Sequence, residues 1–279
     1  MDYHFINFLF FLFLLQVDVS GSFIMYNTLF PMYKRLRNQI QKHIAENYTN
    51  EPEQKLIIST PAGLHGFYLM GVTRYIKENY NLNDFIFSGA SAGSWNSLFL
   101  CFQGNDSEFI DTILNSEIYN ATSINQIEKT MKSIVLEKYN QSQDLFLFDK
   151  MSIGVTTYRF PLRFRLKIYD NFSNLEDALN CCVASSHIPF ITGNILHRYR
   201  REFSFDGGFF SYPYINTTVP TLCISPSMWD SEYTKINSYQ NPLKFSKNNM
   251  NFSSLYLEGY KDSQKNKHHL DRMLRIKKK

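Results

Sequence analysis

The sequence contains few cysteines, little net charge and only one long apolar run. Among its 4 cysteines no Cys/His spacing resembles a zinc site, so we expect no metal. The formal net charge of +4 over 279 residues argues against a nucleic-acid partner. The 44% hydrophobic content is enough for one large domain with a sizeable core. Cys181 and Cys182 lie in an apolar helical stretch, where small buried side chains are expected.

The one long apolar run, residues 5–17, is shorter than the roughly 20 residues that a membrane-spanning helix needs. Its length is typical of a signal peptide, so we predict a signal peptide or signal anchor over residues 1–21. Asn-x-Ser/Thr sequons, which accept N-glycans in secreted proteins, begin at Asn47, Asn105, Asn120, Asn140, Asn171, Asn216 and Asn251. The leader and the sequons favour the secretory pathway or membrane association.

A polar, helix-compatible lead-in over residues 22–54 is followed by alternating strand-like and helix-like segments. An apolar run at 55–59 precedes a turn and helical spacing over 66–80, and the same order repeats from residue 84 to 102. This rhythm predicts a parallel α/β sheet. Further along, we expect helices over 106–117, 124–139 and 175–185, two strands within 151–169, and a strand at 221–225.

The domain is expected to span residues 55–226, with a polar, basic extension over residues 227–279. Residues 261–279 carry eight Lys or Arg side chains and two Asp side chains. Such a segment either binds an anionic bilayer or is a solvated tail.

The motif GASAG, residues 89–93, places Ser91 between a strand-like run and an apolar helix. A serine on such a sharp turn exposes its hydroxyl at the carboxyl edge of the sheet, where the helix N-terminus stabilises negative charge. Gly89 and Gly93 are expected there because side chains would collide with the neighbouring strand and helix. The pattern is that of a nucleophile elbow, and the alternative is that Ser91 only caps the helix.

A nucleophilic serine needs a base and an oxyanion hole. The segment TPAGLHG, residues 60–66, is a second strand-to-helix turn whose backbone N–H groups are candidates for the oxyanion hole. Downstream, Asp206 precedes Gly207 and Gly208. An Asp held by a tight glycine turn accepts a proton from a serine where burial and geometry allow, although Asp-Gly-Gly is also a common ordinary turn.

In this order, the three segments resemble the patatin-like phospholipases. That family has a Gly-rich oxyanion loop entering a helix, then G-x-S-x-G, then Asp-Gly-Gly or Asp-Gly-Ala; this chain has AGLHGFYLMGV, GASAG and DGG. A fourth stretch, ASSHIPFITG at residues 184–193, is similar to the Ala-Ser-x-x-Ile-Pro segment of the animal triacylglycerol-lipase branch. The resemblance covers about residues 55–225.

The resemblance implies a patatin-like three-layer α/β/α sandwich with a mainly parallel central sheet. It also implies a catalytic dyad without histidine, metal or cofactor, with Ser91 as nucleophile and Asp206 as general base. Gly66 is a further motif glycine, and the candidate oxyanion donors are the backbone amides of Ala62, Gly63, Leu64 and Ala92. Pro61 stands where the family usually has glycine and has no N–H to donate, which leaves the donors' identity and the level of activity open.

The implied activity is hydrolysis of fatty-acyl esters of phospholipids or neutral glycerolipids at a membrane or lipid-droplet surface. One alternative is a Ser-His-Asp esterase or thioesterase using His268 or His269, which follow Asp206 but lie in the polar tail. Another is an inactive lipid-binding protein that lost turnover through Pro61.

His65 is a candidate for lining the acyl pocket, and His187 is expected to be structural.

Overall fold

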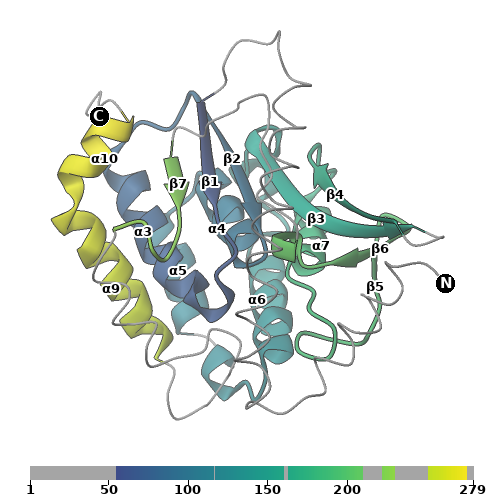
Figure 1. Cartoon of the computed structure of the whole chain (residues 1–279). Coiled ribbons are helices and arrows are strands. Elements are labelled where there is room, and N and C mark those ends of the chain that lie inside the picture. Colours follow the sequence, from purple (N-terminus) through teal and green to yellow (C-terminus); the bar gives the residue numbers. More distant parts are fainter. Residues whose placement is uncertain (1–54, 116, 160–162, 210–221, 230–250, 275–279) are drawn as a thin grey trace, which may run out of the picture.

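The computed structural model describes residues 55–115, 117–159, 163–209, 222–229 and 251–274. These residues build a seven-stranded sheet in the order β5-β6-β3-β2-β1-β7, with β4 also paired to β3 (Figure 1). The strands are β1 (Lys55–Ser59), β2 (Phe85–Ala90), β3 (Met151–Arg159), β4 (Arg163–Tyr169), β5 (His197–Tyr199), β6 (Glu202–Phe205) and β7 (Leu222–Ile224).

The centre of the sheet is parallel. β7, β1, β2 and β3 pair in parallel, whereas β4, β5 and β6 form an antiparallel end beyond β3. Nearly all described side chains of β1, β2 and β3 are buried, which explains why these strands read as continuous apolar runs rather than as alternating ones. The fold is a three-layer α/β/α sandwich with a mainly parallel central sheet, as expected from the sequence.

The helices follow the strand-helix rhythm of the sequence. They are α3 (Gly66–Asn79), α4 (Ala92–Cys101), α5 (Asp106–Leu114), α6 (Ile124–Tyr139), α7 (Leu175–Ser185), α9 (Phe252–Lys265) and α10 (Lys267–Leu274). α4 packs against β1, β2 and β3, and α7 packs against α4 and β3, so both lie behind the sheet in Figure 1. Cys181 and Cys182 are fully buried in α7, which confirms their expected role as small core residues.

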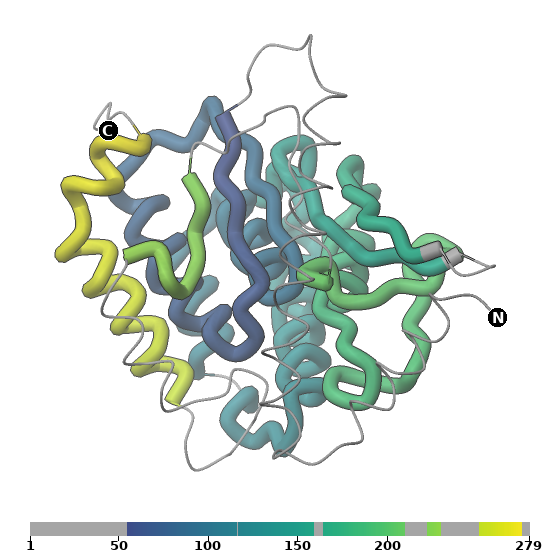
Figure 2. The backbone as a smooth tube through the Cα atoms, viewed as in Figure 1, coloured from purple at the N-terminus to yellow at the C-terminus, as the bar shows by residue number. Residues whose placement is uncertain are grey.

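The C-terminal helices α9 and α10 are part of this fold, which corrects the expectation of a polar extension or solvated tail over that stretch. α9 runs beside α3 at the β7 end of the sheet (Figure 2). The two helices meet at glycines, because a Cβ on Gly259 would overlap the Tyr68 carbonyl and one on Gly71 the Tyr256 carbonyl. The apolar side chains that this segment buries are Phe252, Leu255, Leu270 and Leu274. Their helical spacing leaves the lysines on the outer face.

The signal segment 1–21 and the lead-in 22–54 lie outside the described residues, so both remain predictions. Among the described helices, none combines the length and the apolar character needed to cross a membrane. Five sequon asparagines fall within the described chain, and all five side chains are exposed: Asn105, Asn120, Asn140, Asn171 and Asn251. Asn47 and Asn216 fall outside it.

Candidate active site

Ser91 occupies the turn from β2 into α4 with φ 54° and ψ −131°. Residues with a side chain rarely adopt a positive φ, so the turn holds local strain of the kind found at functional sites. The Ser91 side chain makes no capping hydrogen bond, and the alternative that it merely caps α4 is therefore wrong. Its backbone is held on both sides, because its N–H donates to Ser185 Oγ at 2.8 Å and its carbonyl accepts from the Ser94 hydroxyl at 2.6 Å.

The glycines around Ser91 are required by close approach of backbone to backbone. A Cβ on Gly93 would overlap the Ser59 carbonyl of β1, and a Cβ on Gly89 would overlap the Gly93 carbonyl. A Cβ on Gly66 would lie 2.9 Å from the Ala92 Cβ. The start of α3 is thus pressed against the start of α4, and both helix N-termini lie beside Ser91.

Asp206 follows β6 and begins the tight turn Gly207–Phe209. Its Oδ1 accepts the Gly208 N–H at 2.7 Å, and its own N–H donates to the His187 carbonyl at 2.8 Å. Gly207 has no room for a side chain, because a Cβ there would overlap the Gly154 carbonyl of β3. The Asp-Gly-Gly turn therefore fixes the carboxylate against the end of the sheet.

Ser91 and Asp206, far apart in the sequence, meet at this edge. The Ser91 hydroxyl is close enough to the Asp206 carboxyl to lower its pKa. The Oδ2 atom of Asp206 is buried without a hydrogen-bond partner among the described residues. Burial raises the pKa of Asp206 to about 6, against the opposing effects of the Ser91 hydroxyl and the Gly208 N–H. Such a carboxylate is ionised at neutral pH yet is a stronger base than an ordinary aspartate. Hydrogen bonds between catalytic groups are often long until substrate binds. The placement of the Asp206 carboxylate beside Ser91 therefore suits a general base.

A short segment at the C-terminal end of α7 connects the two residues, a role that sequence reasoning did not assign to it. Ser185 Oγ accepts the Ser91 N–H and donates to the Gly154 carbonyl at 2.7 Å. Two residues later, His187 holds the Asp206 backbone through its carbonyl. The His187 ring is buried 5.3 Å from the His197 ring, and burial lowers its pKa to about 4. The ASSHIP stretch was the available signal.

Three of the four expected oxyanion donors border the same cavity as Ser91. Gly63, Leu64 and Ala92 line it, and within the described chain their backbone N–H groups donate to no protein acceptor. Ala62 does not line the cavity; its carbonyl accepts the His65 N–H at 3.1 Å. Gly63 has φ 54°, a conformation that glycine adopts without cost.

Pro61 packs against the Asp-Gly-Gly turn. A Cβ on Gly208 would lie 2.6 Å from the Pro61 Cγ, so the proline ring fills the space between the oxyanion turn and the turn that holds Asp206. Pro61 has no N–H, but Gly63, Leu64 and Ala92 retain theirs.

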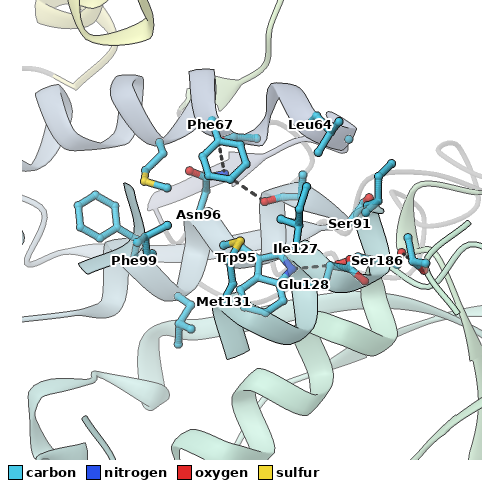
Figure 3. A pocket seen from close by; sticks show the side chains of 18 of the residues that line it. Leu64, Phe67, Ser91, Trp95, Asn96, Phe99, Ile127, Glu128, Met131 and Ser186 are labelled. Atoms are coloured by element: carbon cyan, nitrogen blue, oxygen red, sulfur yellow. Dashed lines mark hydrogen bonds between the residues drawn. The ribbon is translucent and has the colours of Figure 1, made fainter. Parts of the chain in front are cut away.

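An apolar cavity extends from Ser91 along α4. Figure 3 shows Ser91 and Ser186 at one end and Phe99 at the other. The wall is built from α3, α4, α5 and α6 and includes Phe67, Met70, Phe99, Phe109, Ile127 and Met131. An apolar cavity that opens beside Ser91 suits a fatty-acyl chain.

One polar group interrupts this wall. Glu128 of α6 lines the cavity with 8% of its surface exposed, and burial raises the pKa of its carboxyl well above the usual range, with the charge of Asp206 adding to the effect. Nearby, Trp95 Nε1 donates to Ser186 Oγ at 3.0 Å. Sequence reasoning missed Glu128, because one acidic residue on an amphipathic helix gives no sign of facing inward.

The other histidines considered from the sequence do not line the cavity. His65 is buried but does not line the cavity, which corrects that expectation. His268 and His269 lie on α10, where the His269 ring contacts Trp229. Within the described chain, the polar groups that act on the Asp206 carboxyl are Ser91 and the Gly208 N–H. No group of His, Cys, Asp and Glu residues in that part of the chain is arranged to hold a metal ion.

Comparisons with known proteins find similarity among solved structures. No family model and no curated protein matches the sequence. Among solved structures, VipD from Legionella pneumophila is similar at a TM-score of 0.36 and 14% identity, over 67% of this chain and 52% of that chain. The chain thus spans about half the length of VipD.

Proposed function

We propose that the protein is a patatin-like serine lipid acyl hydrolase, which cleaves fatty-acyl esters of phospholipids or neutral glycerolipids. One observation carries the proposal. The strained turn of Ser91 opens onto an apolar cavity that extends along α4, while the buried Asp206 carboxyl faces the same serine. An acyl chain in the cavity would bring its ester carbonyl to Ser91.

In the first half of the reaction, the Ser91 hydroxyl attacks the ester carbonyl and transfers its proton to Asp206. The N–H groups of Gly63, Leu64 and Ala92 stabilise the oxyanion of the tetrahedral intermediate, aided by the N-terminus of α4. The intermediate collapses as the alcohol leaves with the proton from Asp206. An ester between the acyl group and Ser91 remains.

In the second half, ionised Asp206 takes a proton from water, and the resulting hydroxide attacks the acyl-enzyme. The second tetrahedral intermediate uses the same N–H groups. Its collapse breaks the bond to Ser91, which regains its proton from Asp206, and releases the fatty acid. Each step uses a group of this chain and needs no cofactor.

Neither alternative activity has comparable support. A Ser-His-Asp triad needs a histidine imidazole hydrogen-bonded to the carboxylate, whereas the side chain beside the Asp206 carboxylate is the Ser91 hydroxyl. An inactive lipid-binding protein would have lost its oxyanion hole through Pro61, yet three backbone donors still border the cavity. Both alternatives remain distinguishable by experiment.

The first test is labelling with a fluorophosphonate probe and fatty-acid release from mixed phospholipid and triacylglycerol micelles. We expect wild type to be labelled and active, and Ser91→Ala to lose both. Asp206→Asn should lose at least on the order of 10³-fold in kcat, as catalytic residues that act as a unit do. Ser107→Ala, at an exposed serine at the start of α5, is the matched control.

Three results would contradict this proposal. Activity that survives in Ser91→Ala would exclude Ser91 as the nucleophile. An active Asp206→Asn together with an inactive His268→Ala or His269→Ala would select the triad enzyme. A folded wild type that binds lipid vesicles but takes no label would select the inactive lipid-binding protein.

A further inference from the structure

The loop between α7 and β5 exposes a cluster of large apolar side chains. Phe190 is 55% exposed, Ile195 45% and Leu196 51%, and these are three of the six exposed large apolar residues in the described chain. Exposed apolar side chains scattered singly are ordinary on soluble proteins, whereas clustered ones mark interaction surfaces. The three side chains lie within seven consecutive residues of one loop, so they are clustered along the chain.

The protein holds this loop in a defined conformation. Thr192 Oγ1 accepts the Ile188 N–H at 2.8 Å and donates to the Ser186 carbonyl at 3.1 Å. The Phe190 N–H donates to the Gly193 carbonyl at 3.1 Å, and Phe190 itself has φ 66°. The exposure of Phe190 is therefore a feature of a hydrogen-bonded turn.

The same loop forms part of the acyl cavity. Ile188 and Thr192 line the cavity, and the residues just before them, Ser185 and His187, hold Ser91 and Asp206 in place. The exposed cluster therefore lies on a loop that also walls the proposed substrate site.

We propose that residues 188–196 dock the enzyme on a phospholipid bilayer, with Phe190, Ile195 and Leu196 entering the acyl region. The proposal rests on the proposed function, because it supplies a route by which an acyl chain leaves the bilayer and enters the cavity without crossing water. Burial of the three side chains in lipid removes their apolar surface from water.

Charge next to the loop fits this partner. The β5–β6 hairpin that follows exposes Arg198 and Arg201, and neither forms an ion pair within the described chain. The Arg198 guanidinium stacks on the Phe203 ring at 4.4 Å. Arginine side chains pair readily with phosphate oxygens, so they suit the headgroup layer beside an inserted apolar loop.

The basic C-terminal helices are the competing docking element. They pack on α3 at the β7 end of the sheet, whereas the loop enters β5 at the other end. α9 and α10 expose apolar side chains of their own, Leu257 at 50% and Met273 at 37%. These residues provide matched control substitutions.

The test uses the full chain and sedimentation with vesicles of phosphatidylcholine and phosphatidylserine. The loop variant combines Phe190→Ser, Ile195→Ser and Leu196→Ser; the apolar control combines Leu257→Ser and Met273→Ser; the charge control combines Lys261→Glu and Lys265→Glu. We expect the loop variant to lose at least roughly 100-fold in vesicle affinity, because each buried apolar side chain contributes about tenfold. Both controls should bind like wild type.

Two further measurements separate this proposal from the proposed function. Hydrolysis of p-nitrophenyl butyrate, a soluble monomeric ester, should be unchanged in the loop variant, whereas hydrolysis of vesicle phospholipid should fall with affinity. Ser91→Ala should bind vesicles like wild type. If wild type binds through the loop but cleaves neither ester, the enzyme proposal fails and the docking surface stands.

The docking proposal is overturned if a folded loop variant, checked by its thermal midpoint, binds vesicles as tightly as wild type. It is also overturned if wild type fails to bind vesicles while it cleaves the soluble ester. If the Lys261→Glu and Lys265→Glu variant loses vesicle binding while the loop variant binds like wild type, docking belongs to the C-terminal helices instead.

Discussion

At the scale of single residues, the chemistry depends on the environment of Asp206. The side chain has one oxygen bonded to the Gly208 N–H and the other buried without a partner among the described residues. The environment therefore disfavours the charged form relative to water, which strengthens the carboxylate as a base. The same burial has consequences for the pH dependence of activity and of stability.

Activity should rise with pH through the titration of Asp206. The carboxyl must be ionised to accept the Ser91 proton, and its pKa is raised to about 6 by burial. We expect kcat/KM for p-nitrophenyl butyrate to fall about tenfold per pH unit below this pKa and to level off above it. Initial rates between about pH 4.5 and 8 measure the profile, and a flat profile would remove Asp206 from the role of base.

Asp206→Asn should increase stability at high pH. The folded-state pKa of about 6 lies above the ordinary aspartate value of 3.8, so the unfolded chain releases this proton first and wild type loses stability as the pH rises between the two values. Two pKa units correspond to about 3 kcal/mol. Urea unfolding of both proteins at about pH 4 and pH 8 should show a variant-minus-wild-type difference that grows by up to this amount. A difference independent of pH would contradict the raised pKa.

At the scale of secondary structure elements, the contact between α3 and α9 depends on two glycines. Gly71 and Gly259 each lie against a carbonyl of the opposite helix, so the two backbones touch. An added methyl group can be accommodated only by separating the helices. The buried faces of both helices are then disturbed together.

Gly259→Ala should destabilise the protein even though alanine favours a helix more than glycine does. The added Cβ would overlap the Tyr68 carbonyl, and overpacking of this kind costs about 1–3 kcal/mol. Lys261→Ala, at an exposed position two residues away in α9, is the control and should be nearly neutral. Thermal unfolding compares the three proteins, and a Gly259→Ala variant as stable as wild type would show that the helices separate freely.

At the scale of the whole molecule, the C-terminal helices complete the core of the sandwich. α9 covers α3, and α3 in turn packs against α4 and β7. The edge of the domain near β7 is therefore covered by residues that were predicted from the sequence to form a separate extension.

A chain ending at Met250 should lose cooperative thermal unfolding. It lacks four buried apolar side chains, Phe252, Leu255, Leu270 and Leu274. Each contributes about 1.5–3 kcal/mol, and their sum is comparable with the 5–15 kcal/mol that holds a typical domain folded. A chain ending at Leu274 should unfold like the full chain. Calorimetry distinguishes them, and a stable, cooperative shorter chain would restore the view that this segment is an appendage.

The alternation of strands, turns and helices was predictable because it follows from local patterns of apolar residues. Segments 55–59 and 124–139 have the bounds of β1 and α6 as expected. The C-terminal helices were missed because many lysines obscured an apolar face spaced at helical intervals. The leader, whose 5–17 run lies outside the described residues, stays a prediction.

The sequence by itself determined the local geometry of the candidate site. Gly89, Gly93 and Gly207 are required by short-range backbone contacts, which leave a recognisable pattern of residues. Only the tertiary structure decided which distant groups share that site: the Ser185 and His187 bridge, the inward-facing Glu128 and the cavity along α4. The physical reason is that a local motif specifies the path of its own backbone, whereas contacts between distant residues arise only when the sheet and its helices pack.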